Sequence, residues 1–107
     1  MNVARVAHLL GEPVLTTGFL GGALGAFIEE KLKEEQIETN FTLISDETRN
    51  CIAIVHERQQ TEILESGPRI SDNEAEMFLT QFPSLVEKNK LLVLSGSLPR
   101  GLPTDYY

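Results

Sequence analysis

The sequence predicts an α/β fold in which helices flank a parallel sheet and a small antiparallel sheet is inserted at approximately residues 39–66. Two observations predict this class. Apolar residues at helical spacing alternate with short apolar runs of strand type on both sides of the insertion. Within the insertion, β-branched residues and polar breaks recur at short intervals, as in antiparallel strands. We expect residues 1–107 to form a single partial domain, a segment of a larger α/β domain.

The N-terminal stretch predicts a helix, a buried strand and a second helix. Apolar residues recur at helical spacing over residues 3–10, and Gly11 followed by Pro13 predicts that this helix ends there. Residues 14–19 are an apolar run typical of a strand buried on both faces. The glycines within residues 18–22 then open the next helix. Because ligands collect at the carboxyl ends of such strands, this turn is a candidate ligand-binding region.

The second helix is amphipathic, with an apolar face over residues 24–32, and the antiparallel insertion follows it. We expect the insertion to be a three-stranded antiparallel meander that projects from the α/β body. Cys51 lies in its second strand, and an apolar strand predicts a buried, structural thiol there. The three strands are expected at residues 40–45, 50–57 and 61–65.

The pattern returns to helix and strand after the insertion. Ser71 and Glu74 have the spacing of a capping box, and apolar residues at helical spacing follow them. Pro83 is expected to kink or interrupt this helix. Residues 91–94 predict a second buried strand in the parallel sheet, and Pro103 predicts the start of another helix.

Composition excludes several classes of protein. The net charge of −7 argues against a nucleic-acid partner, which favours a basic surface. The apolar run over residues 14–28 is shorter than the ~18 residues of a membrane span and is interrupted by glycines, so no membrane association is expected. The chain also lacks the features of a signal peptide. A single cysteine suits a reducing compartment, and we expect a cytoplasmic protein.

Arg49 is the first candidate binding residue. It opens the second strand of the insertion, where a guanidinium fork can hold a phosphate or a carboxylate at two points. The alternative is a solvated arginine that pairs with Asp46 or Glu47. The pattern alone favours this alternative.

Further candidates lie at a strand end and at the first helix. Ser95, Gly96 and Ser97 follow the predicted strand at residues 91–94, where hydroxyl and backbone N–H groups can bind a sugar or a phosphate. The alternative is a plain loop. Asn2 stands near a helix start, where a capping role is the alternative to a binding role. The histidines and the cysteine lack the spacing of metal ligands, and no serine–histidine–acid arrangement is apparent.

These residues together resemble the ribokinase-like carbohydrate kinases of the phosphofructokinase B type. Asn2, Ala4, Gly11 and Gly21 match the spacing of the family's first signature. Three further segments are similar to the tagatose-6-phosphate kinases, and the resemblance covers essentially the whole chain. These segments are residues 48–51, 60–64 and 95–101.

The resemblance implies a partial ribokinase-like domain whose antiparallel insertion is a lid over a sugar site. It implies that Asn2 contacts sugar hydroxyls and that Arg49 reaches from the lid to hold the phosphate that the substrate already carries. Ser95, Gly96 and Ser97 would line the sugar pocket. The implied partner is a sugar-phosphate substrate.

The implied function is that of the sugar-binding and lid portion of a kinase that uses ATP and Mg²⁺ to phosphorylate a ketohexose phosphate, first of all tagatose-6-phosphate. A kinase of fructose-1-phosphate or fructose-6-phosphate is the near alternative. Glu62 stands where some relatives carry an arginine. The sequence contains no Gly-x-Gly-Asp motif, which carries the family's catalytic aspartate. We therefore expect no turnover by this chain alone, and neither a catalytic residue nor a complete cofactor site within it.

Two other functions are open to test. The first is a non-catalytic interaction module that forms a homodimer through the lid strands, since exposed strand edges can pair with another copy. The second is a dinucleotide-binding half-domain. Residues 18–22 lack the glycine spacing of that motif, which makes this function the weaker one.

Overall fold

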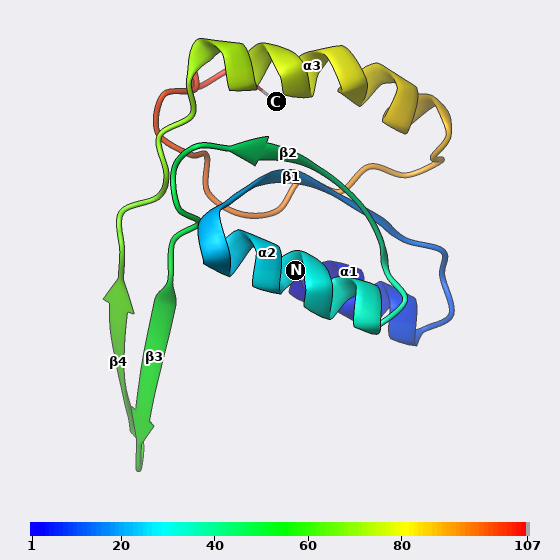
Figure 1. Ribbon diagram of the computed structural model, residues 1–107. Coiled ribbons are helices and arrows are strands. Elements are labelled where there is room, and N and C mark those ends of the chain that lie inside the picture. Colours follow the sequence, from blue (N-terminus) through cyan, green and yellow to red (C-terminus); the bar gives the residue numbers. More distant parts are fainter. Residues whose placement is uncertain (107) are drawn as a thin grey trace.

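The computed structural model describes residues 1–106, and it confirms the α/β class (Figure 1). Among these residues, no helix is long and apolar enough to cross a membrane. The elements in chain order are α1 (Asn2–Leu9), β1 (Leu15–Gly21), α2 (Gly22–Glu34), β2 (Glu38–Ile44), β3 (Cys51–His56), β4 (Gln59–Leu64) and α3 (Asp72–Glu87).

The body consists of a parallel pair of strands between two layers of helices. β1 pairs with β2 in register from Leu15 opposite Glu38 to Gly21 opposite Ile44, and α2 is the crossover between them. Figure 1 shows α3 on one face of this sheet and α1 with α2 on the other. The buried apolar side chains come from all three layers. They are Leu20, Leu32, Ile37, Ile44, Ile70, Phe78 and Leu85.

The α3 layer packs on the sheet through aromatic and polar contacts. The rings of Phe19 in β1 and Phe78 in α3 lie 4.9 Å apart between centroids. The buried Thr42 of β2 accepts a hydrogen bond from the Gln81 side chain of α3. Because buried polar groups need partners, this bond fixes how α3 lies along the sheet.

The predicted three-stranded meander is wrong in its first strand. The strand expected at residues 40–45 is β2, which pairs in parallel with β1 and not with the insertion. The small antiparallel sheet therefore has two strands, β3 and β4, paired from Cys51 opposite Leu64 to His56 opposite Gln59. Alternating residues predict a strand equally well in either sheet, so the choice of partner depends on the crossover helix α2.

The lid hairpin of β3 and β4 stands away from the body (Figure 1). Every residue of the two strands is exposed, because no helix or sheet within residues 1–106 covers either face of the hairpin. The prediction that Cys51 is buried is therefore wrong, and its thiol is free and exposed.

The strand predicted at residues 91–94 does not form. These residues have no regular secondary structure, and Leu91 is 80% exposed. A strand needs the backbone groups of a neighbouring strand, and neither sheet of the described residues supplies them here. The helix predicted from Pro103 is a turn as far as Tyr106, whose N–H donates to the Pro103 carbonyl at 3.1 Å.

Helix α1 ends as the sequence predicts. Gly11 has φ of +90°, in the left-handed region that favours glycine, and its N–H donates to the His8 carbonyl at 2.9 Å. The N–H of Glu12 donates to the Ala7 carbonyl at 3.1 Å. This pair of bonds is the Schellman motif, which satisfies the last carbonyls of the helix.

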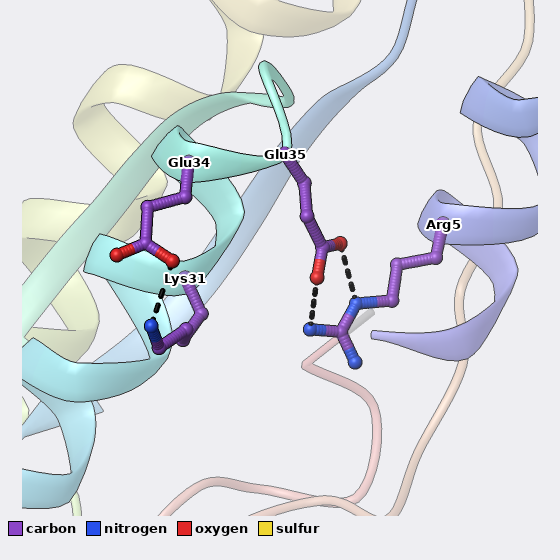
Figure 2. A network of polar contacts seen from close by, with 4 residues as sticks. All are labelled: Arg5, Lys31, Glu34 and Glu35. Carbon is purple, nitrogen blue, oxygen red and sulfur yellow. Dashed lines mark hydrogen bonds and ion pairs between the residues drawn. The ribbon is translucent and has the colours of Figure 1, made fainter.

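An ion pair joins α1 to α2 at the surface (Figure 2). Arg5 donates from Nε and Nη2 to the two carboxylate oxygens of Glu35, at 2.7 and 2.6 Å. Within α2, Lys31 pairs with Glu34 at 2.7 Å. Exposed ion pairs contribute little to stability, but the two-point contact of Arg5 orients one helix against the other.

The predicted capping box of α3 is present, and its Glu74 also binds a residue outside the helix. One carboxylate oxygen of Glu74 accepts from the Ser71 hydroxyl at 2.6 Å and from the Ser71 N–H at 2.8 Å. The other accepts from the N–H and the hydroxyl of Ser45, at 2.7 and 3.0 Å. Bonds from Ser71, then from Ser45, lower the pKa of Glu74 from 4.5 to about 2. The buried carboxylate thus ties α3 to the end of β2, and α3 continues through Pro83 without interruption.

The junction of β1 and α2 is closely packed against the loop after β2. The N–H of Gly21 donates to Thr48 Oγ1 at 2.9 Å, and the N–H of Thr48 donates to the Gly21 carbonyl at 3.0 Å. A Cβ atom on Gly21 would lie 2.0 Å from the Asp46 carbonyl oxygen and 2.7 Å from that of Ile44. Only glycine fits at this position without displacing backbone.

Glu74→Gln is expected to lower the free energy of unfolding by about 2 kcal/mol at pH 7, because charged hydrogen bonds are lost. The pKa of Glu74 is depressed in the folded state, so its contribution is complete above its unfolded value and is lost as the pH falls toward 2. Urea unfolding of both proteins between pH 7 and pH 3 measures this. If the difference in free energy of unfolding between the unaltered chain and Glu74→Gln stayed constant over this pH range, the lowered pKa of Glu74 would be contradicted.

Gly21→Ala is expected to lower the free energy of unfolding by about 2 kcal/mol, because the added methyl group overlaps backbone atoms. Gly67→Ala is the matched control, since a Cβ there meets only Arg49 Cδ at an ordinary 3.9 Å. Urea unfolding of the two variants measures the difference. Equal stability of the two variants would show that the Asp46 loop shifts without cost.

Candidate functional site

The candidate site lies where the two parallel strands end. Because β1 and β2 run in the same direction, their carboxyl ends meet at one edge of the sheet. The loop after β2 and the base of the lid hairpin leave from this edge (Figure 1). This is also the edge at which residues 18–22 were expected to form a ligand-binding turn.

The N-terminus of α2 at this edge is occupied by the protein's own carboxylate. Glu47 Oε1 accepts a hydrogen bond from the Leu24 N–H at 2.9 Å. A Cβ on Gly22 would lie 1.6 Å from Glu47 Oε2, so the carboxylate rests directly on the glycine. A negative group here is stabilised by the helix dipole and satisfies an otherwise unpaired N–H.

Arg49 reaches from the base of the lid to the loop that follows residues 91–94. Its Nη2 atom donates to the Ser97 hydroxyl at 3.1 Å, although the two residues are 48 positions apart in sequence. The alternative pairing of Arg49 with Asp46 or Glu47 is wrong, since no ion pair with either forms among residues 1–106.

Both acidic residues before Arg49 have other partners. The carboxylate of Asp46 accepts from the Arg69 N–H at 2.8 Å, and Glu47 binds α2 as described above. Thr48 is bound to Gly21 through two hydrogen bonds. The residues preceding Arg49 are therefore held by the body, while its guanidinium extends toward Ser97.

The loop that carries Ser97 is fastened to the chain segment after the lid. The Arg100 carbonyl accepts from the Ile70 N–H at 2.8 Å, and Arg100 Nε donates to the Gly67 carbonyl at 2.9 Å. A Cβ on Gly101, whose φ is +92°, would lie 2.2 Å from the Ile70 carbonyl oxygen. This close backbone contact keeps the loop beside the base of the lid.

Ser95 lies in the same loop, two residues before Ser97. It lines a cavity of about 300 Å³ between α1, β1 and the end of α3, with Met1, Val3 and Thr17 among the other lining residues. Gly96 lies between the two serines with φ of +113°, a conformation that favours glycine.

Asn2 is the first residue of α1 and is exposed. The alternative that Asn2 caps this helix is wrong, because Met1 occupies the N-cap position and no side-chain cap bond forms there. Its neighbours Met1 and Val3 line the cavity that Ser95 also lines. Asn2 itself is not among the residues that line this cavity.

Sequence reasoning missed the residues that hold this arrangement in place. The sequence pattern indicates only a polar break at Glu47 and the start of a strand at Thr48, yet both residues bind the β1–α2 junction. Arg100 was noted only within a matching segment. A polar residue directly after a parallel strand was the available signal, because such residues lie at the ligand-binding edge. Among residues 1–106, no group of three His, Cys, Asp or Glu residues could hold a metal ion.

Solved structures with the same fold are phosphofructokinases. A possible 1-phosphofructokinase from Thermotoga maritima has a TM-score of 0.90 and 35% sequence identity, over 95% of this chain and 33% of its own. A putative phosphofructokinase from Staphylococcus aureus has a TM-score of 0.80 and 32% identity, over 98% and 34%. Phosphofructokinase-2 from Escherichia coli in complex with fructose-6-phosphate has a TM-score of 0.80 and 26% identity, over 98% and 35%.

The chain spans about one third of the length of these structures, 33 to 35%. The family model described as pfkB family carbohydrate kinase matches residues 1–107, the whole of the chain. The first two structures exceed 30% identity over nearly all of this chain. This chain belongs to the pfkB family of carbohydrate kinases.

Proposed function

We propose that this chain is the sugar-phosphate-binding and lid portion of a kinase that transfers a phosphoryl group from ATP to a ketohexose phosphate. The observation that carries the proposal is the contact of Arg49 with Ser97, which brings a guanidinium from the lid base to a hydroxyl-bearing loop. A guanidinium beside a hydroxyl is suited to a phosphate monoester, because both groups donate hydrogen bonds to phosphate oxygens.

Each candidate residue has a distinct part in this proposal. Arg49 and the Ser97 hydroxyl hold the phosphate that the substrate already carries. The Ser95 hydroxyl, the Gly96 N–H and the Asn2 amide bind sugar hydroxyl groups. The lid hairpin leaves the body beside these residues (Figure 1). Positioning of the substrate by such groups is the larger part of catalysis in phosphoryl transfer.

Tagatose-6-phosphate is the substrate that we propose first, with fructose-1-phosphate and fructose-6-phosphate as alternatives. The similar structures support the fructose phosphates, since one is a possible 1-phosphofructokinase and another is in complex with fructose-6-phosphate. Similarity of residues 48–51 and 95–101 to tagatose-6-phosphate kinases supports the first choice.

ATP and Mg²⁺ belong to the proposed complete kinase. Residues 1–106 present no cluster of metal-binding side chains, and the sequence has no glycine loop with a phosphate-binding lysine. The residues present do not fit these groups. The part assigned to this chain is to bind and orient the sugar phosphate.

Arg49→Ala is expected to weaken binding of tagatose-6-phosphate by about tenfold to a hundredfold, because charge-assisted hydrogen bonds to the phosphate are lost. Isothermal titration calorimetry of the 107-residue chain measures this. Arg58→Ala is the matched control, since it removes the same charge at the exposed turn between β3 and β4. Parallel titrations with the two fructose phosphates rank the substrates.

Two results would contradict the proposal. Equal affinities of the Arg49→Ala and Arg58→Ala variants would remove Arg49 from the site, and no binding of any of the three sugar phosphates would exclude the substrate class. An ADP-release assay adds a check on the chemistry. Turnover by the chain alone would show that it contains a general base that we have not identified.

A homodimeric interaction module is the second candidate function. Ile52 and Ile63 are paired across the lid, Ile54 lies two residues along on the same face, and all three are about half exposed, at 47, 51 and 52%. If this face forms a dimer, light scattering gives twice the monomer mass, and Ile54→Glu restores the monomer because it places a charge in an apolar interface. A monomer at every concentration would exclude this candidate.

A further inference from the structure

We propose that Arg100 is the second cation of the phosphate site and that it binds the same substrate phosphate as Arg49. This inference rests on the proposed function and adds a residue to the same site. A phosphate monoester carries a charge of about −1.5 to −2 at pH 7, which one guanidinium cannot balance. The chain as a whole has a net charge of −7, so a dianion needs more than one local cation to be held.

The two arginines converge on one glycine. Arg100 Nε donates to the Gly67 carbonyl at 2.9 Å. On the same residue, Arg49 Cδ lies 3.9 Å from the position that a Cβ would occupy. Both side chains therefore lie beside Gly67, in the segment that follows the lid hairpin.

The loop geometry brings the same pair together a second time. Arg49 binds Ser97, and Arg100 follows Ser97 by three residues in a loop that is fastened through the Ile70 N–H. Ser97, which Arg49 contacts, and Arg100 therefore belong to the same short loop. A phosphate at the Ser97 hydroxyl would be within the reach of both flexible side chains.

Donors remain available on both guanidinium groups. Among residues 1–106, Arg49 uses only Nη2 and Arg100 uses only Nε in side-chain hydrogen bonds. Neither forms an ion pair with a carboxylate in this part of the chain, although the protein has 16 acidic residues. Two arginines without a carboxylate partner in an acidic protein are suited to an external anion.

The alternative is that Arg100 only fastens the loop to Gly67. The two roles differ in which ligands they affect, since a fastening role changes the binding of every ligand at the site. A phosphate-binding role changes only the binding of ligands that carry phosphate. Tagatose-6-phosphate, inorganic phosphate and unphosphorylated tagatose separate these effects.

The test is isothermal titration calorimetry of the 107-residue chain and its Arg100→Gln variant with these three probes. Arg58→Gln is the matched control for net charge. We expect Arg100→Gln to weaken binding of tagatose-6-phosphate and of inorganic phosphate by about tenfold or more, with binding of tagatose unchanged. The double variant Arg49→Gln, Arg100→Gln is expected to lose less affinity for the phosphate probes than the product of the two single fold-losses, because both residues hold one phosphate.

Equal affinities of Arg100→Gln and Arg58→Gln for the phosphate probes would overturn the inference and leave the proposed function standing. An equal loss for all three probes would also overturn it, in favour of a fastening role. A third result separates the two proposals. If Arg100→Gln weakens the binding of inorganic phosphate, but tagatose-6-phosphate binds the unaltered chain no more tightly than inorganic phosphate does, the two-arginine site stands and the proposed function fails. If no phosphate probe binds the unaltered chain, both fail. If Arg100→Gln does not fold, Arg100→Lys replaces it, because lysine keeps the charge but lacks the guanidinium fork. Arg100→Lys is expected to weaken binding of the two phosphate probes by a smaller factor and to leave tagatose binding unchanged.

Discussion

The parallel pairing of β1 with β2 is the constraint on which the rest of the structure depends. A crossover helix must connect two parallel strands, so α2 begins where β1 ends and returns the chain to the start of β2. Both carboxyl ends then lie at one edge, and the lid can leave only from there. The glycines that end β1 allow the loop after β2 to approach within bonding distance, as Thr48 does at Gly21.

Polar groups at this edge are used mainly to hold loops in place. Glu74 joins α3 to Ser45, Asp46 binds the Arg69 N–H, and Glu47 covers the start of α2. Each carboxylate satisfies backbone N–H groups that would otherwise lack a partner near the surface of the body. The acidic residues therefore do not neutralise the arginines beside them. Arg49 and Arg100 keep free donors because the nearby carboxylates already have partners.

Many exposed apolar residues lie in segments with strand-forming sequence that no other layer of the described residues covers. The lid strands and residues 91–94 both have the composition of buried strands, yet their side chains face solvent. The chain spans about one third of the length of the phosphofructokinase structures that it matches, 33 to 35%. Membership of the pfkB family thus rests on a body and a lid that are recognisable without the remaining length of those proteins.

The sequence by itself determined the local helix signals and the family. Helical spacing, the Gly11 stop and the Ser71–Glu74 capping box depend on contacts within a few residues, and all three are present in the structure. Arg49 and Ser97 were both identified as candidates from residue type and position. Their contact could not be predicted, because 48 residues separate them. It depends on tertiary contacts such as the bond from the Ile70 N–H to the Arg100 carbonyl, which holds the Ser97 loop beside the base of the lid.

Only the tertiary structure decided which strands pair and which residues are covered. The alternating side chains of residues 40–45 fit a strand of the antiparallel lid as well as a strand of the parallel sheet. Because α2 crosses over from β1, this strand pairs with β1 in the parallel sheet. An apolar run predicts burial only if another layer exists to cover it, which is why Cys51 and residues 91–94 were assigned wrongly. Strand pairing and burial depend on distant parts of the chain, whereas helix ends depend on their immediate neighbours.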